Sequence, residues 1–220
     1  MSAVSSTQPV LFIGPSASGI SVDRHFAGTI MPPIRRGDLD ALTRSATPPD
    51  AVGIVDGTFH QSLAVTPKEV LRALDAGIRL YGASSMGALR AVECTPYGMV
   101  GVGRIFQMDA TGEVDADDEV AITYDPETGI AMSEPMVNIR VVVEVAVGSG
   151  ALEANDVDLV LDAAKALYFP DRSYARILAV LRDTMAADRL DRFAEFVHSD
   201  EHPDQKRTDA LELISIMVAR

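Results

Sequence analysis

The chain has 220 residues, of which 47% are hydrophobic, and a formal net charge of −13 at neutral pH. This size and apolar content suffice for one substantial core, so we expect one compact unit. The single cysteine, Cys94, excludes an internal disulfide and a zinc site built from several cysteines. The negative charge disfavours binding to nucleic acid or to an anionic membrane. Neither a long apolar span nor a secretory leader is evident, so we expect a cytoplasmic protein.

Two short apolar runs near the start of the chain predict strands that are buried on both faces of a parallel sheet. Val10–Ile13 stops at Gly14, and Ala51–Val55 stops at Asp56. Loops at the carboxyl ends of parallel strands are where open α/β sheets place their binding sites. We therefore expect Ser16, in the loop after the first strand, and Asp56 to lie at the ligand-binding edge.

The loop after the first predicted strand does not fit a nucleotide site. Gly14 and Gly19 have the spacing of a phosphate-binding loop, but no lysine follows the second glycine, as that motif requires. The next segment, residues 29–38, contains two prolines and is typical of a turn-rich connection. It leads to a short predicted helix at Leu39–Arg44.

The sequence Thr66-Pro67-Lys68-Glu69 marks the start of a helix that we expect to end at Gly77. Thr66 and Glu69 form a capping box, and the proline takes the first helical position. Lys68 then lies in the first turn, where the positive end of the helix dipole favours the neutral amine, as does any burial. A neutral lysine can act as a general base toward a serine hydroxyl, so Lys68 is a candidate catalytic base. The alternative is a solvent-exposed lysine on a well-capped helix.

Residues 78–93 predict a strand, a tight turn and a helix, because the apolar spacing changes from that of a strand to that of a helix at Gly82. Ser85 lies in Ala83-Ser84-Ser85-Met86-Gly87, a relative of the nucleophile elbow with alanine in place of the first glycine. Such a turn lifts a serine hydroxyl above the sheet, and the unpaired amides of the following helix can hold an oxyanion. The alternative is that the serine only caps the helix.

Three features follow this segment. The glycine-rich residues 96–106 predict tight packing or a mobile loop that leads into a helix. The acidic residues Asp115 and Asp117–Glu119 lack the spacing of a calcium loop and favour a solvated turn. Residues 119–124 and 130–132, separated by a turn sequence, predict a β-hairpin.

From Ser133 onward the apolar periodicity is helical, over residues 133–148, 153–168, 173–187, 190–197 and 204–218. We therefore expect an α/β core over residues 1–132, with a mainly parallel sheet and flanking helices, and an all-helical region over residues 133–220 packed on it. His198 and His202 match an inverted zinc motif around Glu201. Pro203 follows at once and few residues remain to supply a third ligand, so we expect neither a metal nor another cofactor.

Several of these motifs together resemble the TfuA-like family, in the same order along residues 11–121. The most specific is the stretch from Gly82 to Ala91, which reads Gly-Ala-Ser-Ser-Met-Gly-Ala-Leu-Arg-Ala. Supporting motifs are Gly14-Pro15-Ser16, Arg36-Gly37-Asp38-Leu39, Val55-Asp56-Gly57-Thr58-Phe59, Lys68-Glu69-Val70-Leu71, Gly98-Met99, Gly101-Val102-Gly103 and Asp117-Asp118-Glu119-Val120-Ala121.

The resemblance implies a partner of a YcaO-type enzyme, which installs thioamides in a peptide backbone. It implies that the protein hydrolyses the C-terminal thiocarboxylate of a ThiS-type sulfur-carrier protein to release sulfide. It also implies that the protein strengthens the binding of the YcaO enzyme to its precursor peptide. A Ser-Lys hydrolytic pair is a further implication, and the positions here that match are Lys68 and either Ser84 or Ser85.

The residue analysis and the resemblance converge on one hypothesis, in which Lys68 removes the proton of Ser85 and Ser84 is the alternative nucleophile. The residues expected to bind the substrate are Gly14, Ser16, Asp56, Gly57, Met86, Gly87 and Arg90. Arg90 either orients this machinery or pairs with Glu93 on the same helix. The rival hypothesis is a non-catalytic adaptor that binds the YcaO enzyme or its precursor peptide, with the serines acting only as helix caps.

Overall fold

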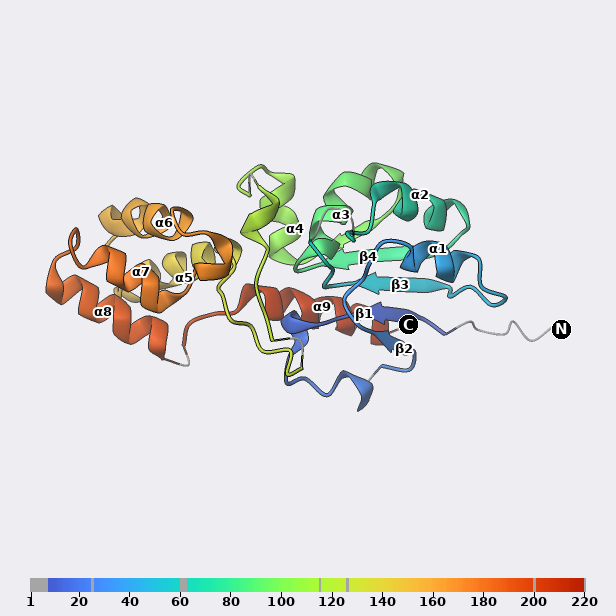
Figure 1. The fold of residues 1–220 in the computed structure, drawn as a ribbon, viewed down its shortest axis with the longest axis horizontal. Coiled ribbons are helices and arrows are strands. Elements are labelled where there is room, and N and C mark those ends of the chain that lie inside the picture. Colours follow the sequence, from blue (N-terminus) through green and yellow to red (C-terminus); the bar gives the residue numbers. More distant parts are fainter. Residues whose placement is uncertain are drawn as a thin grey trace. The chain divides into compact units, whose positions relative to one another are not determined.

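Short apolar runs form a five-stranded parallel sheet in the computed structural model (Figure 1), which describes residues 8–24, 26–59, 63–114, 116–125, 127–199 and 201–219. In spatial order the strands are β2 (Thr29–Met31), β1 (Val10–Phe12), β3 (Ala51–Ile54), β4 (Arg79–Ala83) and β5 (Val100–Val102). Gly53 of β3 pairs with Leu11 on one side and Tyr81 on the other. The predicted α/β class with a parallel sheet is confirmed.

The two edge strands, β2 and β5, were not predicted from the sequence. Each is three residues long, and each pairs with one neighbouring strand only. Both contain side chains that are exposed, so neither forms the continuous apolar run that identifies a buried strand. The turn-rich connection at residues 29–38 therefore begins with a strand, and the glycine-rich residues 96–106 contain another.

Helices cover both faces of the sheet (Figure 1). On one face lie α1 (Asp38–Thr43), α2 (Pro67–Asp75) and α3 (Met86–Cys94), whose apolar side chains share a buried cluster with Val10, Phe12, Val52 and Ile54. On the other face, α9 (Gln205–Val218) packs Leu213 and Met217 into a second cluster with Leu11 and Tyr81. The helix α4 (Gly103–Ala110) follows the edge strand β5.

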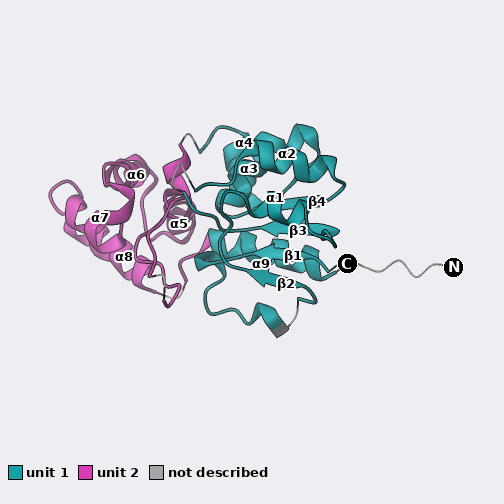
Figure 2. Cartoon of the chain, turned by 45° about the vertical axis from the view of Figure 1, so that its right-hand side comes forward, with its two compact units in different colours: residues 1–115, 206–220 teal, residues 116–205 magenta. Residues whose placement is uncertain are grey.

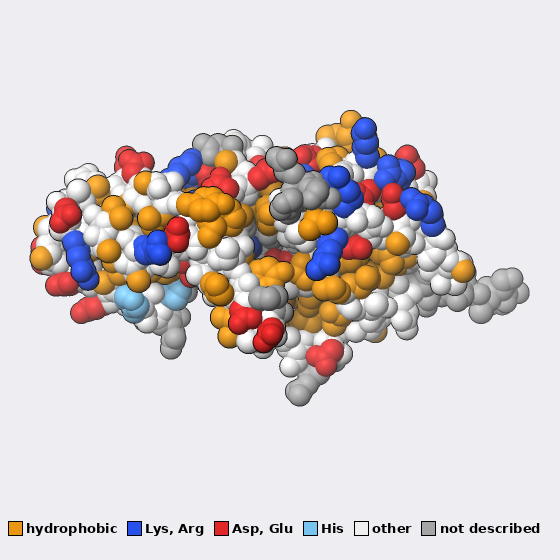
Figure 3. Space-filling model, in the orientation of Figure 1, with side chains coloured by type: hydrophobic (Ala, Val, Ile, Leu, Met, Phe, Trp, Pro, Cys, Tyr) orange, Lys and Arg blue, Asp and Glu red, His pale blue; other side chains and the backbone are white. Residues whose placement is uncertain are grey.

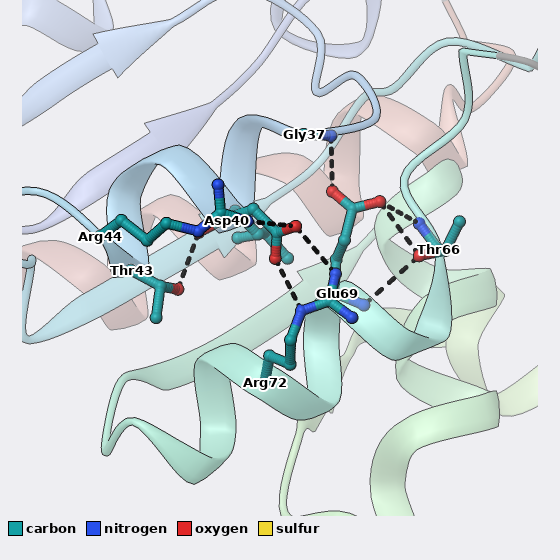
Figure 4. Close-up of polar contacts among 8 residues, drawn as sticks. Gly37, Asp40, Thr43, Arg44, Thr66, Glu69 and Arg72 are labelled. Carbon is teal, nitrogen blue, oxygen red and sulfur yellow. Dashed lines mark hydrogen bonds and ion pairs between the residues drawn. The ribbon is translucent and has the colours of Figure 1, made fainter.

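The predicted capping box at the start of α2 is confirmed (Figure 4). Thr66 Oγ1 accepts the Glu69 amide at 3.3 Å, and the Glu69 carboxylate accepts the Thr66 amide at 3.2 Å. The other carboxylate oxygen of Glu69 accepts the Gly37 amide at 2.6 Å, which fixes the start of α1. Arg72 also binds Asp40 at 2.8 Å, and this guanidinium lowers the pKa of the Asp40 carboxyl.

The chain divides into two compact units (Figure 2). Unit 1 contains residues 1–115 and 206–220, and unit 2 contains residues 116–205. The expected α/β core over residues 1–132, with an all-helical region over residues 133–220 packed on it as one compact unit, stays a prediction. The expected hairpin region belongs to the helical unit, where Ser133 accepts the Thr123 amide at 2.8 Å. The last helix returns to unit 1, because its apolar face packs on the sheet.

Unit 2 contains α5 (Met136–Ser149), α6 (Val157–Lys165), α7 (Tyr174–Leu181) and α8 (Ala187–His198). These helices share one hydrophobic cluster. In the expected β-hairpin, the described residues form one antiparallel bridge, between Tyr124 and Ala131. Asp117–Glu119 forms a 3-10 turn. Within the described ranges of the chain, no helix has both the length and the apolar character needed to cross a membrane.

The excess of acidic residues is not gathered on one patch of the face drawn in Figure 3. Acidic and basic side chains are interspersed there, and hydrophobic side chains gather between them. Large hydrophobic side chains are exposed in both units, among them Tyr97 and Val100 in unit 1 and Ile130 and Met132 in unit 2.

The acidic run predicted to form a solvated turn instead ends in a buried carboxylate. Glu119 is only 1% exposed. Both of its oxygens bind Arg140, at 2.7 and 2.9 Å, and Lys165 approaches one of them at 3.2 Å. The carboxylate is buried because two cations on α5 and α6 compensate its charge. Asp117 and Asp118 are exposed as expected, and Asp115 lies outside the described residues.

Replacing Glu119 by glutamine removes this charge and leaves Arg140 and Lys165 without their shared partner. We expect the free energy of unfolding to fall by about 3 kcal/mol, as is typical when one member of a buried ion pair is removed. Urea denaturation followed by circular dichroism measures it. The control is Asp158→Asn, an exposed carboxylate in the same unit, for which we expect a change below about 0.5 kcal/mol. Equal stability of the two variants would contradict a stabilising role for the Glu119 cluster.

Candidate functional site

The strand–turn–helix predicted around Ser85 is confirmed, and its turn is strained. Among the described non-glycine residues, Ser84 alone has a positive φ, of 70°. The Ser85 amide donates to the Ala83 carbonyl oxygen at 2.8 Å, which closes a three-residue γ-turn centred on Ser84. The helix α3 then begins at Met86. Strained backbone of this kind is found most often at functional sites.

Glycines allow the elbow to form. A Cβ atom on Gly87 would lie 1.8 Å from the Ile54 carbonyl oxygen, and one on Gly82 would lie 2.0 Å from the Gly87 carbonyl oxygen. The Gly87 amide donates to the Val55 carbonyl oxygen at 3.3 Å. The start of α3 is therefore in direct backbone contact with the ends of β3 and β4. Residues 82 and 87 must be small because backbone atoms occupy the space next to them.

Ser85 lies against a lysine from the last helix. Its side chain is 2% exposed, and Lys206, on the first turn of α9, is 3% exposed. The Lys206 Nζ donates to the Ser85 Oγ at 3.3 Å. Although Ser85 occupies the N-cap position of α3, its hydroxyl makes no capping hydrogen bond. Removal from water favours the neutral form of an amine, which can accept the proton of a serine hydroxyl.

The structure brings Lys206, and not Lys68, to the serine. Lys68 is exposed, and within the described residues no hydrogen bond or ion pair joins it to Ser84 or Ser85. The buried face of α2 carries Glu69, Val70 and Ala73. Lys68 lies on the exposed face of the same helix. The alternative interpretation of Lys68, an exposed lysine on a well-capped helix, describes its place in the fold.

A sequence signal for Lys206 exists, although the sequence analysis did not use it. The buried residues of α9 are Lys206, Asp209, Ala210, Leu213, Ile214 and Met217, which share one helical face. Lys206 lies at the start of this largely apolar face and is buried with it. A charged residue in such a position is a candidate functional group.

Ser84 is fully buried, and its hydroxyl donates to the backbone carbonyl oxygen of Lys206. The two adjacent serines therefore both contact the lysine, but at different groups: Ser84 at the backbone and Ser85 at the amine. Of the two candidate nucleophiles, Ser85 is the one whose hydroxyl oxygen lies next to a potential base.

The first amides of α3 differ in their partners. Those of Ala88 and Leu89 donate to the Ser85 carbonyl oxygen at 3.0 and 3.3 Å, and Gly87 is bound to Val55. The Met86 amide has no hydrogen-bond acceptor among the described residues. It is the amide directly after Ser85, the position from which a nucleophile elbow supplies an oxyanion donor.

The predicted substrate-binding residues that follow β1 and β3 are joined by hydrogen bonds. The Asp56 carboxylate accepts the amides of Gly14 and Ser16 at 2.9 and 3.0 Å and the Ser16 hydroxyl at 2.7 Å. Asp56 is therefore used to hold the loop after β1. Gly57 packs against Met86, since a Cβ atom on Gly57 would lie 2.8 Å from the Met86 side chain. These residues lie at the carboxyl edge of adjacent parallel strands, as expected.

Arg90 has a structural role in this arrangement. Its Nε donates to the Val65 carbonyl oxygen at 2.8 Å, and its Nη1 binds Glu93 at 2.5 Å. The alternative that Arg90 and Glu93 pair on the same helix is confirmed.

Both histidines of the inverted zinc motif contact backbone carbonyl oxygens. The Nδ1 atoms of His198 and His202 lie 2.6 Å from the Ala194 carbonyl oxygen and 2.7 Å from that of Ser199. The described part of the chain contains no group of three or more His, Cys, Asp or Glu residues that could hold a metal ion.

A sequence model of the TfuA-like protein family matches residues 56–173, just over half of the chain. The chain belongs to the TfuA-like family. The match includes both serines of the elbow, and Lys206 lies beyond its end. Membership supports a role in processes associated with thioamidation. A search of curated proteins finds no match.

The backbone contact at Gly87 predicts a large effect for one methyl group. Because a Cβ atom there would overlap the Ile54 carbonyl, we expect Gly87→Ala to lower the free energy of unfolding by about 3 kcal/mol or more. The control is Gly148→Ala on α5, where the added atom meets nothing within 4 Å. We expect it to stabilise by about 0.5–1 kcal/mol, because alanine loses less backbone entropy. Urea unfolding measures both, and equal stabilities would contradict the predicted overlap.

Cys94, at the end of α3, is predicted to be unreactive in the folded protein. Burial raises the pKa of its thiol, and the nearby Glu93 carboxylate adds to this. We expect iodoacetamide at pH 8 to alkylate the native protein about a hundredfold more slowly than the urea-unfolded protein. The pKa of this thiol is higher in the native state than in the unfolded state. The free energy of unfolding therefore falls as the pH rises above about 8.5. Cys94→Ala should lose that part of the pH dependence, and rapid native alkylation would contradict the prediction.

Proposed function

We propose that this protein is an accessory hydrolase of peptide thioamidation, which releases sulfide from a thiocarboxylated ThiS-type sulfur carrier for a YcaO-type enzyme. The observation that carries this proposal is the buried contact of 3.3 Å between Lys206 Nζ and Ser85 Oγ at a strained elbow. A buried serine–lysine contact supports a hydrolytic Ser-Lys pair. The substrate and the partner follow from what the family resemblance implies.

In the first step, Lys206 in its neutral form takes the proton of Ser85, and the serine oxygen attacks the carbon of the thiocarboxylate. A bond forms between Oγ and that carbon, and the carbonyl electrons move to the oxygen. The Met86 amide is placed to stabilise the resulting oxyanion, with the positive end of α3 behind it. The carbon–sulfur bond then breaks, and Lys206 returns its proton to the departing sulfur, which leaves as hydrosulfide (HS⁻).

In the second step, water replaces sulfide. Lys206 removes a proton from that water, which attacks the acyl-enzyme carbon and frees Ser85. The carrier leaves with an ordinary carboxylate at its C-terminus. One lysine thus serves both half-reactions as a general base and then as a general acid.

The burial of Ser85 limits the shape of the substrate. Because Ser85 is only 2% exposed, the proposed substrate approaches its hydroxyl with a narrow, extended chain end and not with a folded surface. The C-terminal tail of a small carrier protein fits this requirement, because its reactive carbon is at the end of the chain. The proposed partners are accordingly the sulfur carrier, the YcaO-type enzyme and its precursor peptide.

The proposal predicts that Ser85→Ala, Lys206→Ala and Lys206→Arg each lower sulfide release from a thiocarboxylated carrier by about a hundredfold or more. Arginine keeps the charge but cannot become neutral at physiological pH, so it should not replace the base. The matched control is Lys68→Ala, for which we expect nearly wild-type release because that side chain is exposed. Sulfide release is measured under saturating carrier. Equal release by all variants would contradict the catalytic proposal and leave the non-catalytic adaptor.

A further inference from the structure

Three residues near the start of α9 form hydrogen bonds with other parts of unit 1. The Lys206 carbonyl oxygen accepts the hydroxyl of Ser84. The Arg207 guanidinium donates to the Ser18 carbonyl oxygen at 2.6 Å. The Asp209 carboxylate accepts the amides at the start of α4, from Arg104 at 3.1 Å and Ile105 at 2.8 Å. The backbone that carries the lysine is therefore held on several sides.

Among these contacts, the one from Ser84 acts on residue 206 itself. A lysine side chain is long and flexible, so the place of its amine depends on where its backbone is held. Ser84 is the immediate neighbour of Ser85 and binds the backbone of the lysine whose amine contacts Ser85. The two adjacent serines therefore have different contacts with the lysine. Ser85 contacts its amine, and Ser84 holds its backbone.

The backbone conformation of Ser84 is strained. Its φ of 70° is one that glycine adopts freely and other residues adopt only with strain. A glycine here would form the same turn with less strain, but it would leave the Lys206 carbonyl oxygen without this hydroxyl donor. The hydroxyl is the feature that glycine would lose.

We propose that Ser84 is a positioning residue, whose hydroxyl fixes the backbone of Lys206 so that the lysine amine stays within reach of Ser85. This inference rests on the proposed Ser-Lys function and assigns Ser84 a different part in it from that of a second nucleophile. Ser85 is the nucleophile, and Ser84 acts through the lysine.

The test compares Ser84→Gly and Ser84→Ala, which both remove the hydroxyl but differ in backbone strain. The control is Ser133→Ala, which removes the hydroxyl of a buried serine in unit 2. Two readouts are measured: kcat and KM for sulfide release from a thiocarboxylated carrier, and the rate at which a fluorophosphonate probe labels the protein, with the labelled residue mapped by mass spectrometry. Thermal unfolding establishes that each variant is folded.

We expect both Ser84 variants to lose about tenfold in kcat with KM unchanged, and to slow labelling of Ser85 by a similar factor. The Ser133 control should match wild type in both assays. Since glycine relieves strain and alanine does not, a loss that is shared by both variants identifies the hydroxyl, and a loss confined to alanine would overturn the proposal.

The following results would overturn the positioning role of Ser84, and they distinguish its failure from failure of the proposed function. Wild-type rates in Ser84→Gly would remove the positioning role and leave the Ser85–Lys206 pair intact. Labelling of wild type at residue 84 would make Ser84 the nucleophile. A wild-type protein that neither releases sulfide nor reacts with the probe would overturn the proposed function, and the positioning role with it.

Discussion

The packing of α9 against the sheet is the interaction on which the candidate site depends. Leu213 fits against β3 because Gly53 has no side chain there, since a Cβ atom on that glycine would lie 2.8 Å from Leu213 and from Leu11. Because the apolar face of the helix packs on the sheet, its first turn lies at the carboxyl edge of the strands. Lys206 is buried there. The elbow alone would present a serine hydroxyl with no base beside it.

This arrangement joins residues that are 121 positions apart, because all of unit 2 lies between the elbow and α9. Closing so long a loop costs entropy that grows slowly with its length, and the apolar surface buried by α9 has to offset it. The Ser85–Lys206 contact therefore exists only when the last helix has joined a sheet formed by the first half of the chain. A partly folded chain carries the serine without the lysine that contacts it.

The sequence predicts the structure where the determining forces are local. The strands β1, β3 and β4, the capping box at Thr66 and the turn at Ser85 all follow from short patterns of apolar, small and capping residues. The sequence does not reveal β2 and β5, because their exposed side chains interrupt the apolar run that identifies a buried strand. It also does not reveal the burial of Glu119, which depends on cations in two later helices. The lysine that contacts Ser85 was missed because helix packing across the whole chain decides which lysine faces the serine.

The two lysines separate the contributions of the helix dipole and of burial. Lys68 and Lys206 both occupy the second position of a helix, so each lies near the positive end of a helix dipole. That field is worth at most about 1 kcal/mol at a surface site. Burial acts much more strongly on a lysine amine, and it distinguishes Lys206 from Lys68. Position in a helix can therefore nominate a catalytic lysine, but the face that the helix buries decides which one can act as a base.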